Sequence, residues 1–119
     1  MPSPLPRWLH VEQVGDVTVA RFPHRCDLMG EAVELIGDQL EALVDEEGRC
    51  RLLLNLDGVD ILESKMLGRL LTLNKKVLAA GGRLKLCCVP PHLAEVFERA
   101  KLDNLMGIYP SEEEALRTY

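Results

Sequence analysis

The sequence lacks the short motifs that would point directly to a chemical reaction. It has neither a glycine-rich phosphate loop of the G-x-G-x-x-G or G-x-x-x-x-G-K type nor the G-x-S-x-G turn of an α/β hydrolase. His10, His24 and His92 are scattered over a predicted strand, a loop and the start of a helix, so no catalytic triad is indicated. We therefore expect no catalytic residue, and a protein that is not an enzyme.

Metal-binding patterns are also missing. None of the four cysteines forms a Cys-x-x-Cys pair, and no histidine lies at zinc-ligand spacing from Cys26, Cys50, Cys87 or Cys88. Cys87 and Cys88 end an apolar segment, where cysteine behaves as a small hydrophobic residue. The sequence thus predicts no metal site and no cofactor.

Basic residues are too few for a typical nucleic-acid-binding protein. With 14 Lys and Arg against 19 Asp and Glu, the net charge is -5, whereas phosphate backbones require a basic surface. No apolar run approaches the roughly 20 residues that span a bilayer, and residues 1–6 lack the apolar segment of a signal peptide. We expect no direct contact with nucleic acid or membrane, and a cytoplasmic location.

What the sequence does contain is enough for one globular domain. Its 119 residues are 47% hydrophobic and 28% charged, a composition that buries a core without disulfides or metals. Three prolines among the first six residues predict a flexible N-terminal arm over residues 1–7. The remaining residues, 8–119, show no linker or repeat and are expected to fold together.

Hydrophobic periodicity and turn residues divide the chain into alternating strands and helices. Strands are predicted at Trp8–Val14, Val17–Phe22, Arg51–Leu56, Arg83–Val89 and Gly107–Tyr109. Helices are predicted at about Gly30–Asp45, Ser64–Ala80 and Pro91–Lys101, with a short fourth helix after the capping box that begins at Ser111. The segment Pro23–Met29 is expected to be irregular.

This order predicts an α/β fold with a mostly parallel sheet of four to five strands, covered by about four helices. The nearly continuous apolar run Leu52–Leu56 is typical of a central strand that is buried on both faces. In the second helix, periodicity places five residues inward, namely Leu67, Leu70, Leu71, Val77 and Leu78.

The most informative segment joins that central strand to the second helix. An acidic loop delivers Ser64 to the start of the helix, where free backbone N–H groups favour a serine cap and, more strongly, a phosphate. The hydroxyl of Ser64 is therefore a candidate cap, a candidate phosphorylation switch, or both. Asp27 is expected at the end of another strand, where sites form in α/β sheets, although a simple turn-forming role suits it equally.

Two charged stripes are predicted on the first two helices. The first helix presents Glu34, Asp38, Glu41 and Asp45, and the second presents Lys65, Arg69 and Lys76 on an exposed stripe. These stripes are either solvated faces that pair with each other or, for the basic stripe, a surface that meets an acidic partner. For the basic stripe we favour the partner surface.

Five fragments in register resemble the STAS domain family, which is named for sulphate transporters and anti-sigma factor antagonists. They are Cys26-Asp27-Leu28, Leu54 to Asp60, Glu63-Ser64-Lys65-Met66-Leu67-Gly68, Ala79 to Leu84, and the segment from Leu102 to Leu116. The chain is most similar to the short, single-domain anti-sigma factor antagonists of bacteria, and the resemblance covers about residues 8–116.

The resemblance implies a STAS fold and a partner, a kinase-type anti-sigma factor that phosphorylates the serine matched by Ser64, with a phosphatase that reverses the reaction. It also implies a partner-binding face around Asp27, Glu63 and Ser64, which includes the neighbouring Lys65 and Met66. Met66 is expected to add bulk beside the serine. The chain departs from the family pattern at Lys65 and Met66, which replace Ser or Thr and Gly. Two alternatives therefore stay open: a scaffold module without phosphoregulation, and a domain that binds a small ligand or nucleotide.

Overall fold

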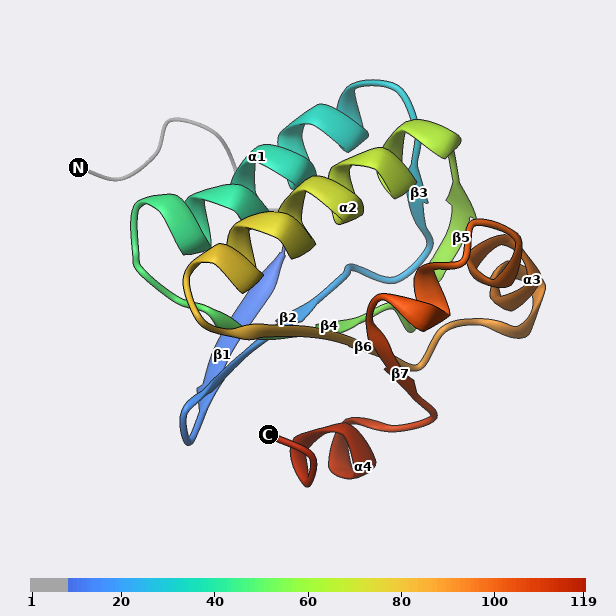
Figure 1. The fold of residues 1–119 in the computed structure, drawn as a ribbon. Coiled ribbons are helices and arrows are strands. Elements are labelled where there is room, and N and C mark those ends of the chain that lie inside the picture. The colour runs from blue at the N-terminus through green and yellow to red at the C-terminus, as the bar shows by residue number, and fades with distance from the viewer. Residues whose placement is uncertain (1–8) are drawn as a thin grey trace.

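A five-stranded sheet forms the centre of the structure, a computed structural model that describes residues 9–119. Its strands lie in the order β1-β2-β4-β6-β7 (Figure 1), and only the β1–β2 pair is antiparallel. Their bounds are His10–Val14, Val17–Arg21, Arg51–Asn55, Arg83–Cys87 and Gly107–Tyr109. The predicted sheet is confirmed, whereas the predicted arm over residues 1–7 lies outside the described residues, as does Trp8.

The central strand β4 shows why a continuous apolar run predicts a strand buried on both faces. Leu52 and Leu54 join the large core cluster under α1 and α2, and Leu53 joins a smaller cluster on the opposite face with Val19 and Ala115. All three leucines have no exposed surface. Because successive strand residues point to opposite faces, both clusters are anchored by the same strand.

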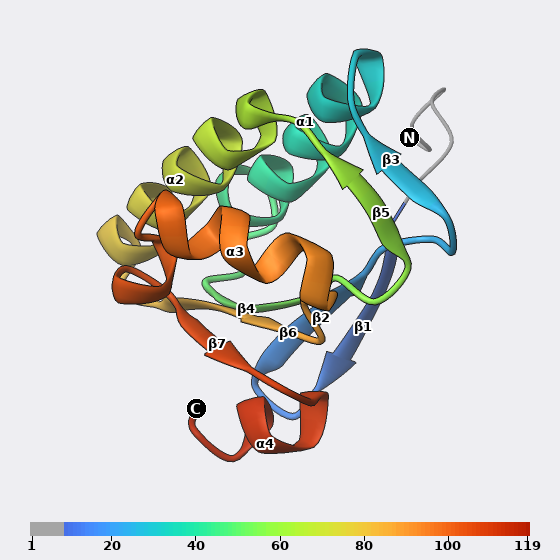
Figure 2. The ribbon, with the colours of Figure 1, turned by 90° about the vertical axis from the view of Figure 1, so that its right-hand side faces the viewer.

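Helices cover the two faces unequally. The long helices α1 (Glu31–Asp45) and α2 (Ser64–Ala79) lie side by side over one face, and the short helix α4 (Glu112–Leu116) lies on the other (Figure 1). Helix α3 (Pro91–Arg99) and the 3-10 turn η1 (Leu102–Asn104) connect β6 to β7 (Figure 2). The four predicted helices are thus confirmed.

A second, two-stranded parallel sheet was not expected. It pairs β3 (Cys26–Leu28) with β5 (Val59–Leu62). The prediction that Pro23–Met29 is irregular was therefore wrong for Cys26–Leu28, and the acidic loop predicted before Ser64 contains the strand β5. The two strands run directly into α1 and α2 (Figure 2). The small sheet therefore holds the N-termini of both helices at one end of the molecule.

Helix α4 is fixed to the sheet by polar contacts at its first turn. Ser111 caps the helix by accepting a hydrogen bond from the Glu114 N–H at 3.2 Å. The Glu112 carboxylate accepts from Arg21 Nε at 2.7 Å, Arg21 Nη2 at 2.8 Å and Asn55 Nδ2 at 2.5 Å. The hydrogen bond from Arg21 is the main reason that the pKa of Glu112 lies below its ordinary value.

Candidate functional site

Ser64 is the first residue of α2, and its side chain is exposed. The N-cap position belongs to Glu63, and no side chain caps this helix. The expectation that Ser64 is an N-cap was therefore wrong, because the chain enters the helix one residue earlier than a serine cap requires. The hydroxyl makes no capping bond and projects from the first turn of a helix, where the dipole favours negative charge.

Glu63 links the starts of the two long helices. Its Oε2 accepts a hydrogen bond from the Gly30 N–H at 3.4 Å and lies 3.8 Å from Lys65 Nζ. The backbone N–H of Glu63 also donates to Leu28 O at 3.0 Å. Gly30 has a φ of +56°, a conformation that glycine adopts without strain. These contacts give the surface around Ser64 a defined shape.

Asp27 lies in the middle of β3, next to this surface. Its side chain is exposed between the buried Cys26 and Leu28, and in the β3–β5 pair it stands opposite Ile61. Because the chain continues from Ile61 through Leu62 and Glu63 to Ser64, the small sheet carries Asp27 close to the start of α2. The sequence-predicted residues Asp27, Glu63, Ser64 and Lys65 thus occupy one end of the molecule.

Two apolar residues on this end were missed by the sequence analysis. Met29 is 45% exposed and Ile61 is 46% exposed, while most large apolar side chains in the described residues are buried. Met29 connects β3 to α1, and Ile61 belongs to β5. Nothing in the sequence separates them from core residues, since their exposure follows from the small sheet that was not predicted.

Met66 does not lie on the surface. Its side chain has no exposed area and packs in the main core cluster with Leu70, Leu73 and Val77. The expectation that Met66 adds bulk beside Ser64 and contacts a partner is corrected by this burial: the inward face of α2 begins at Met66, so its side chain points toward the sheet. Leu78, which was expected inward, is 46% exposed at the edge of that face.

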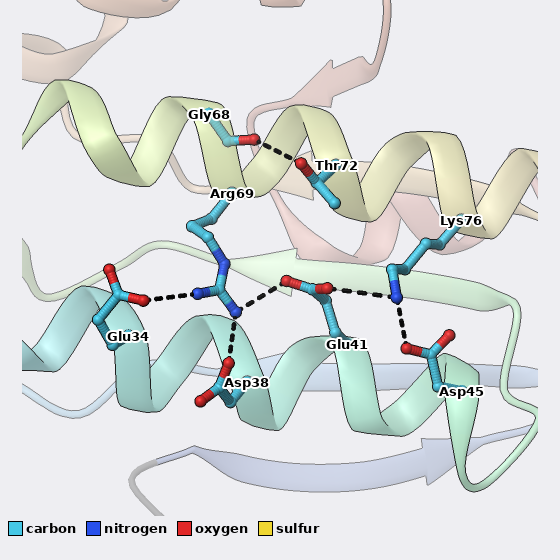
Figure 3. A network of polar contacts seen from close by, with 8 residues as sticks. All are labelled: Glu34, Asp38, Glu41, Asp45, Gly68, Arg69, Thr72 and Lys76. Carbon is cyan, nitrogen blue, oxygen red and sulfur yellow. Dashed lines mark hydrogen bonds and ion pairs between the residues drawn. The ribbon is translucent and has the colours of Figure 1, made fainter.

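Two basic side chains of α2, those of Arg69 and Lys76, form ion pairs with the acidic stripe of α1 (Figure 3). Arg69 Nη1 lies 2.9 Å from Glu34 Oε2, and its Nη2 lies 2.7 Å from Asp38 Oδ1 and 2.8 Å from Glu41 Oε2. Lys76 Nζ lies 3.3 Å from Glu41 Oε1 and 2.5 Å from Asp45 Oδ2. At Arg69 and Lys76, the basic stripe that was expected to be exposed therefore forms an interhelical network of ion pairs instead.

Electrostatics agree with this pairing. The pKa of Arg69 is raised, chiefly by the hydrogen bond to Asp38, and the pKa of Lys76 is raised, chiefly by the hydrogen bond to Asp45. The side chain of Arg69 is only 21% exposed, and its Nε has no hydrogen-bond partner among the described residues. To contact a partner, either cation would have to give up its α1 carboxylates.

The histidines are not brought together by the fold. His10 lies in β1, His24 lies in the loop before β3, and the ring of His92 contacts Asp60 O at 2.7 Å through its Nε2. Within residues 9–119, no group of three or more His, Cys, Asp or Glu side chains is placed to hold a metal ion. The feature that distinguishes this site is the exposed serine on a structured helix start.

The fold and site define a small α/β domain with an accessible hydroxyl at the start of its second helix. The STAS domain model matches residues 9–115, so the chain belongs to the STAS domain family. Among the helices of residues 9–119, none combines the length and the apolar character needed to cross a membrane.

Solved structures of similar size share the fold. An anti-sigma-factor antagonist (STAS) domain protein from Planctomyces limnophilus is 27% identical with a TM-score of 0.80, and the match covers 92% of this chain and 96% of that one. A putative anti-sigma factor antagonist from Thermotoga maritima is 22% identical, with a TM-score of 0.80 and 92% of each chain covered. The Bacillus cell fate determinant SpoIIAA in its phosphorylated form is 23% identical, with a TM-score of 0.71, over 92% of this chain and 97% of that one.

Proposed function

We propose that this protein is an anti-sigma factor antagonist that binds a kinase-type anti-sigma factor and is released when that kinase phosphorylates Ser64. The proposal rests on the position of Ser64, whose hydroxyl is exposed at the first turn of α2 and makes no capping hydrogen bond. The similarity to an anti-sigma-factor antagonist domain protein and to a phosphorylated STAS protein supports it. Such a role in transcription regulation belongs to the cytoplasm, and a phosphatase would restore the unmodified form.

The docking face of this proposal consists of six residues at the end of the molecule where α1 and α2 begin: Asp27, Met29, Ile61, Glu63, Ser64 and Lys65. Met29 and Ile61 supply exposed apolar surface that a partner can bury. Arg69 and Lys76 are left outside the face because α1 neutralises both. Met66 contributes only by packing beneath the face.

Phosphorylation would weaken binding through charge. A phosphoserine adds about two negative charges, and Asp27 and Glu63 already make this surface acidic. A kinase must also bring the phosphates of its nucleotide close to the serine hydroxyl. After transfer, the phosphate on Ser64 is therefore repelled by the negative charge of the nucleotide that is still bound to the kinase. Lys65, at the next position in the chain, can pair with the phosphate and reduce the repulsion.

The departures from the family pattern support a second candidate, a scaffold module without phosphoregulation. Lys65 places a cation beside the serine, and the buried Met66 occupies a position that is glycine in the pattern the chain resembles. A scaffold of this kind would use the same docking face, and Ser64 would have no switching role. The two candidates differ in what happens when a charge is placed at Ser64.

The test is binding to the cognate anti-sigma factor, measured by titration calorimetry for wild type, Ser64→Ala and Ser64→Asp. We expect Ser64→Ala to bind like wild type and to resist release by the kinase with ATP. Ser64→Asp should raise the Kd by at least about tenfold, equivalent to about 1.4 kcal/mol. Thr72→Asp is the matched control, because Thr72 is exposed on the same helix two turns beyond Ser64.

Stability should be measured for the same variants. Because Ser64 makes no capping bond, Ser64→Ala should change the free energy of unfolding by less than about 0.5 kcal/mol, whereas loss of a true cap costs about 1 kcal/mol. If Ser64→Asp binds as tightly as wild type and the kinase leaves Ser64 unmodified, the scaffold role is correct. If no variant binds an anti-sigma factor, the antagonist role itself is wrong.

A further inference from the structure

A groove lies at the other end of α2, away from Ser64. It has a volume of about 360 Å³ and is bounded by the C-terminal half of α2, the start of β6 and the segment from η1 into β7. Leu78, which lines the groove, lies fourteen positions after Ser64, and a helix rises about 1.5 Å per residue, so the two are about 21 Å apart along the axis. The groove is therefore separate from the docking face.

A buried amide without a partner faces this groove. Asn74 is only 6% exposed and is one of the residues that line the groove, yet no residue of the described chain forms a hydrogen bond with its side chain. By contrast, the hydroxyl of Thr18, the other buried polar side chain among the described residues, donates to Gln13 Oε1 at 2.8 Å. The amide atoms of Asn74 are not among the fully buried, unpaired side-chain atoms of residues 9–119, so they are accessible from the groove and free to bond to a ligand there.

The chemistry of such a ligand follows from the amide itself. An asparagine side chain offers one acceptor and two N–H donors, which matches the C=O and N–H of a peptide backbone. A ligand with a main-chain peptide group satisfies both kinds of bond at once. A purely apolar ligand would leave Asn74 unpaired, and a simple anion would use only its donors.

The sheet supplies a second feature that suits a peptide. β7 begins at Gly107 opposite Lys85, so Arg83 and Leu84, the first two residues of β6, have no strand neighbour on that side. On their other side they pair with Arg51 and Leu52 of β4. Arg83 and Leu84 both line the groove, and an unpaired strand edge can accept an extended segment by main-chain hydrogen bonds.

The rim of the groove is apolar and carries three charged residues, the cations Arg83 and Lys85 and the carboxylate Asp103. Leu78 is 46% exposed and Leu105 is 56% exposed, which makes them two of the four large hydrophobic residues that are exposed in residues 9–119. Arg83 is exposed, and within residues 9–119 its guanidinium donates to the neighbouring Gly82 O alone, at 3.3 Å. An apolar side chain flanked by a carboxylate would therefore find complementary surface and charge.

We propose that this groove binds an extended acidic peptide segment of a partner protein. One apolar side chain of the segment lies between Leu78 and Leu105, a main-chain peptide group pairs with the Asn74 amide, and an Asp or Glu faces Arg83. The site does not depend on the role proposed for Ser64, since the two surfaces share no residue.

The probe for this site is a displayed library of short random peptides, selected on the full chain and counter-selected on Leu105→Glu. We expect enriched peptides to combine an apolar residue with Asp or Glu. Their Kd, measured by fluorescence polarisation, should rise at least about tenfold on Asn74→Leu and on Leu105→Glu. Arg83→Glu should weaken peptides that carry a carboxylate and spare those in which it is replaced by an amide.

Ser64→Asp is the control in the same assay, and it should leave peptide binding unchanged. Leu105 is exposed, so Leu105→Glu should keep the circular dichroism spectrum and cooperative unfolding of the wild type. The proposal is overturned if no peptide is enriched, or if enriched peptides bind Asn74→Leu as tightly as wild type. It is also overturned if sedimentation shows self-association that Leu105→Glu abolishes, because a second copy is then the occupant.

Discussion

Replacing Gly37 with alanine should test the interhelical network in the most direct way. Gly37 is a buried residue in the middle of α1, and the Arg69 side chain crosses the helix at this point. A Cβ added to Gly37 would lie 2.5 Å from Arg69 Cζ and 2.6 Å from its Nε, far inside the contact distance. The guanidinium reaches the three carboxylates of α1 because Gly37 has no side chain.

Two opposing contributions decide the size of the effect. Alanine in a helix interior is about 1 kcal/mol more favourable than glycine. Against this gain, the displaced guanidinium would weaken its contacts with Glu34, Asp38 and Glu41, and partly exposed ion pairs are each worth about 0.2–1 kcal/mol. We expect the two contributions to cancel or to leave Gly37→Ala destabilising by up to about 1 kcal/mol.

A double-mutant cycle separates the two contributions. In an Arg69→Ala background the clash is absent, so Gly37→Ala should stabilise the protein by about 1 kcal/mol, giving a coupling energy of at least about 1 kcal/mol. Urea unfolding followed by circular dichroism measures all four proteins. Gly68→Ala in α2 is the control, since a Cβ there meets no atom within 4 Å, and its effect should be the same in both backgrounds. Equal stabilisation by Gly37→Ala with and without Arg69 would refute the reasoning.

Two further predictions concern polar groups elsewhere. Asn74→Leu should leave the free energy of unfolding unchanged or raise it by up to about 1 kcal/mol in urea titrations, because the amide that it removes makes no hydrogen bond within the described residues; a loss of stability would mean that the amide is hydrogen-bonded. Glu112→Gln should lower stability at pH 7, where the carboxylate is bound by Arg21 and Asn55. Because the pKa of Glu112 is lowered in the folded protein, this difference is fully present above the unfolded pKa of about 4.3 and is lost as the pH falls through the folded value. Acid titrations that show a constant difference below pH 4 would contradict it.

The elements that the sequence predicts well are those with a strong local signal. The nearly continuous apolar run Leu52–Leu56 predicts β4, because such a run is typical of a strand that is covered on both faces. α1 follows from apolar residues at helical spacing, and the structure buries all of them, namely Ala32, Val33, Ile36, Leu40, Leu43 and Val44. In both elements, the apolar residues of the sequence are the residues that the fold buries.

The small sheet could not be predicted, because β3 and β5 have three and four residues and depend on each other. Their register shifts between Cys26 and Asp27, so no regular alternation is present to be recognised. The candidate site is affected as well, since the exposure of Met29 and Ile61 depends on this sheet. A local pattern cannot identify an exposed apolar residue whose position is set by a strand far away in the sequence.

The inward face of α2 that was predicted from the sequence also differs from the observed one. Met66, Leu70, Leu73, Asn74 and Val77 are buried, whereas Leu71 is half-buried and Leu78 is exposed. Leucine content alone favours a face that includes Leu71 and Leu78, whereas the face that packs in the core begins at Met66 and includes Leu73. Beside this face, Arg69 and Lys76 meet the carboxylates of α1 (Figure 3), a pairing that a prediction based on hydrophobicity does not include.

The pairing of Arg69 and Lys76 with α1 has a functional consequence. The middle of α2, where both cations are paired, separates Ser64 at one end from the groove near Leu78 at the other. Coupling between two sites requires an element with two alternative arrangements that each ligand favours differently. The structure shows α2 in one arrangement, packed against α1 and β6, and we expect no such coupling along it. Charge at Ser64 should therefore change contacts at the docking face alone, which is why Ser64→Asp can serve as a control for the groove.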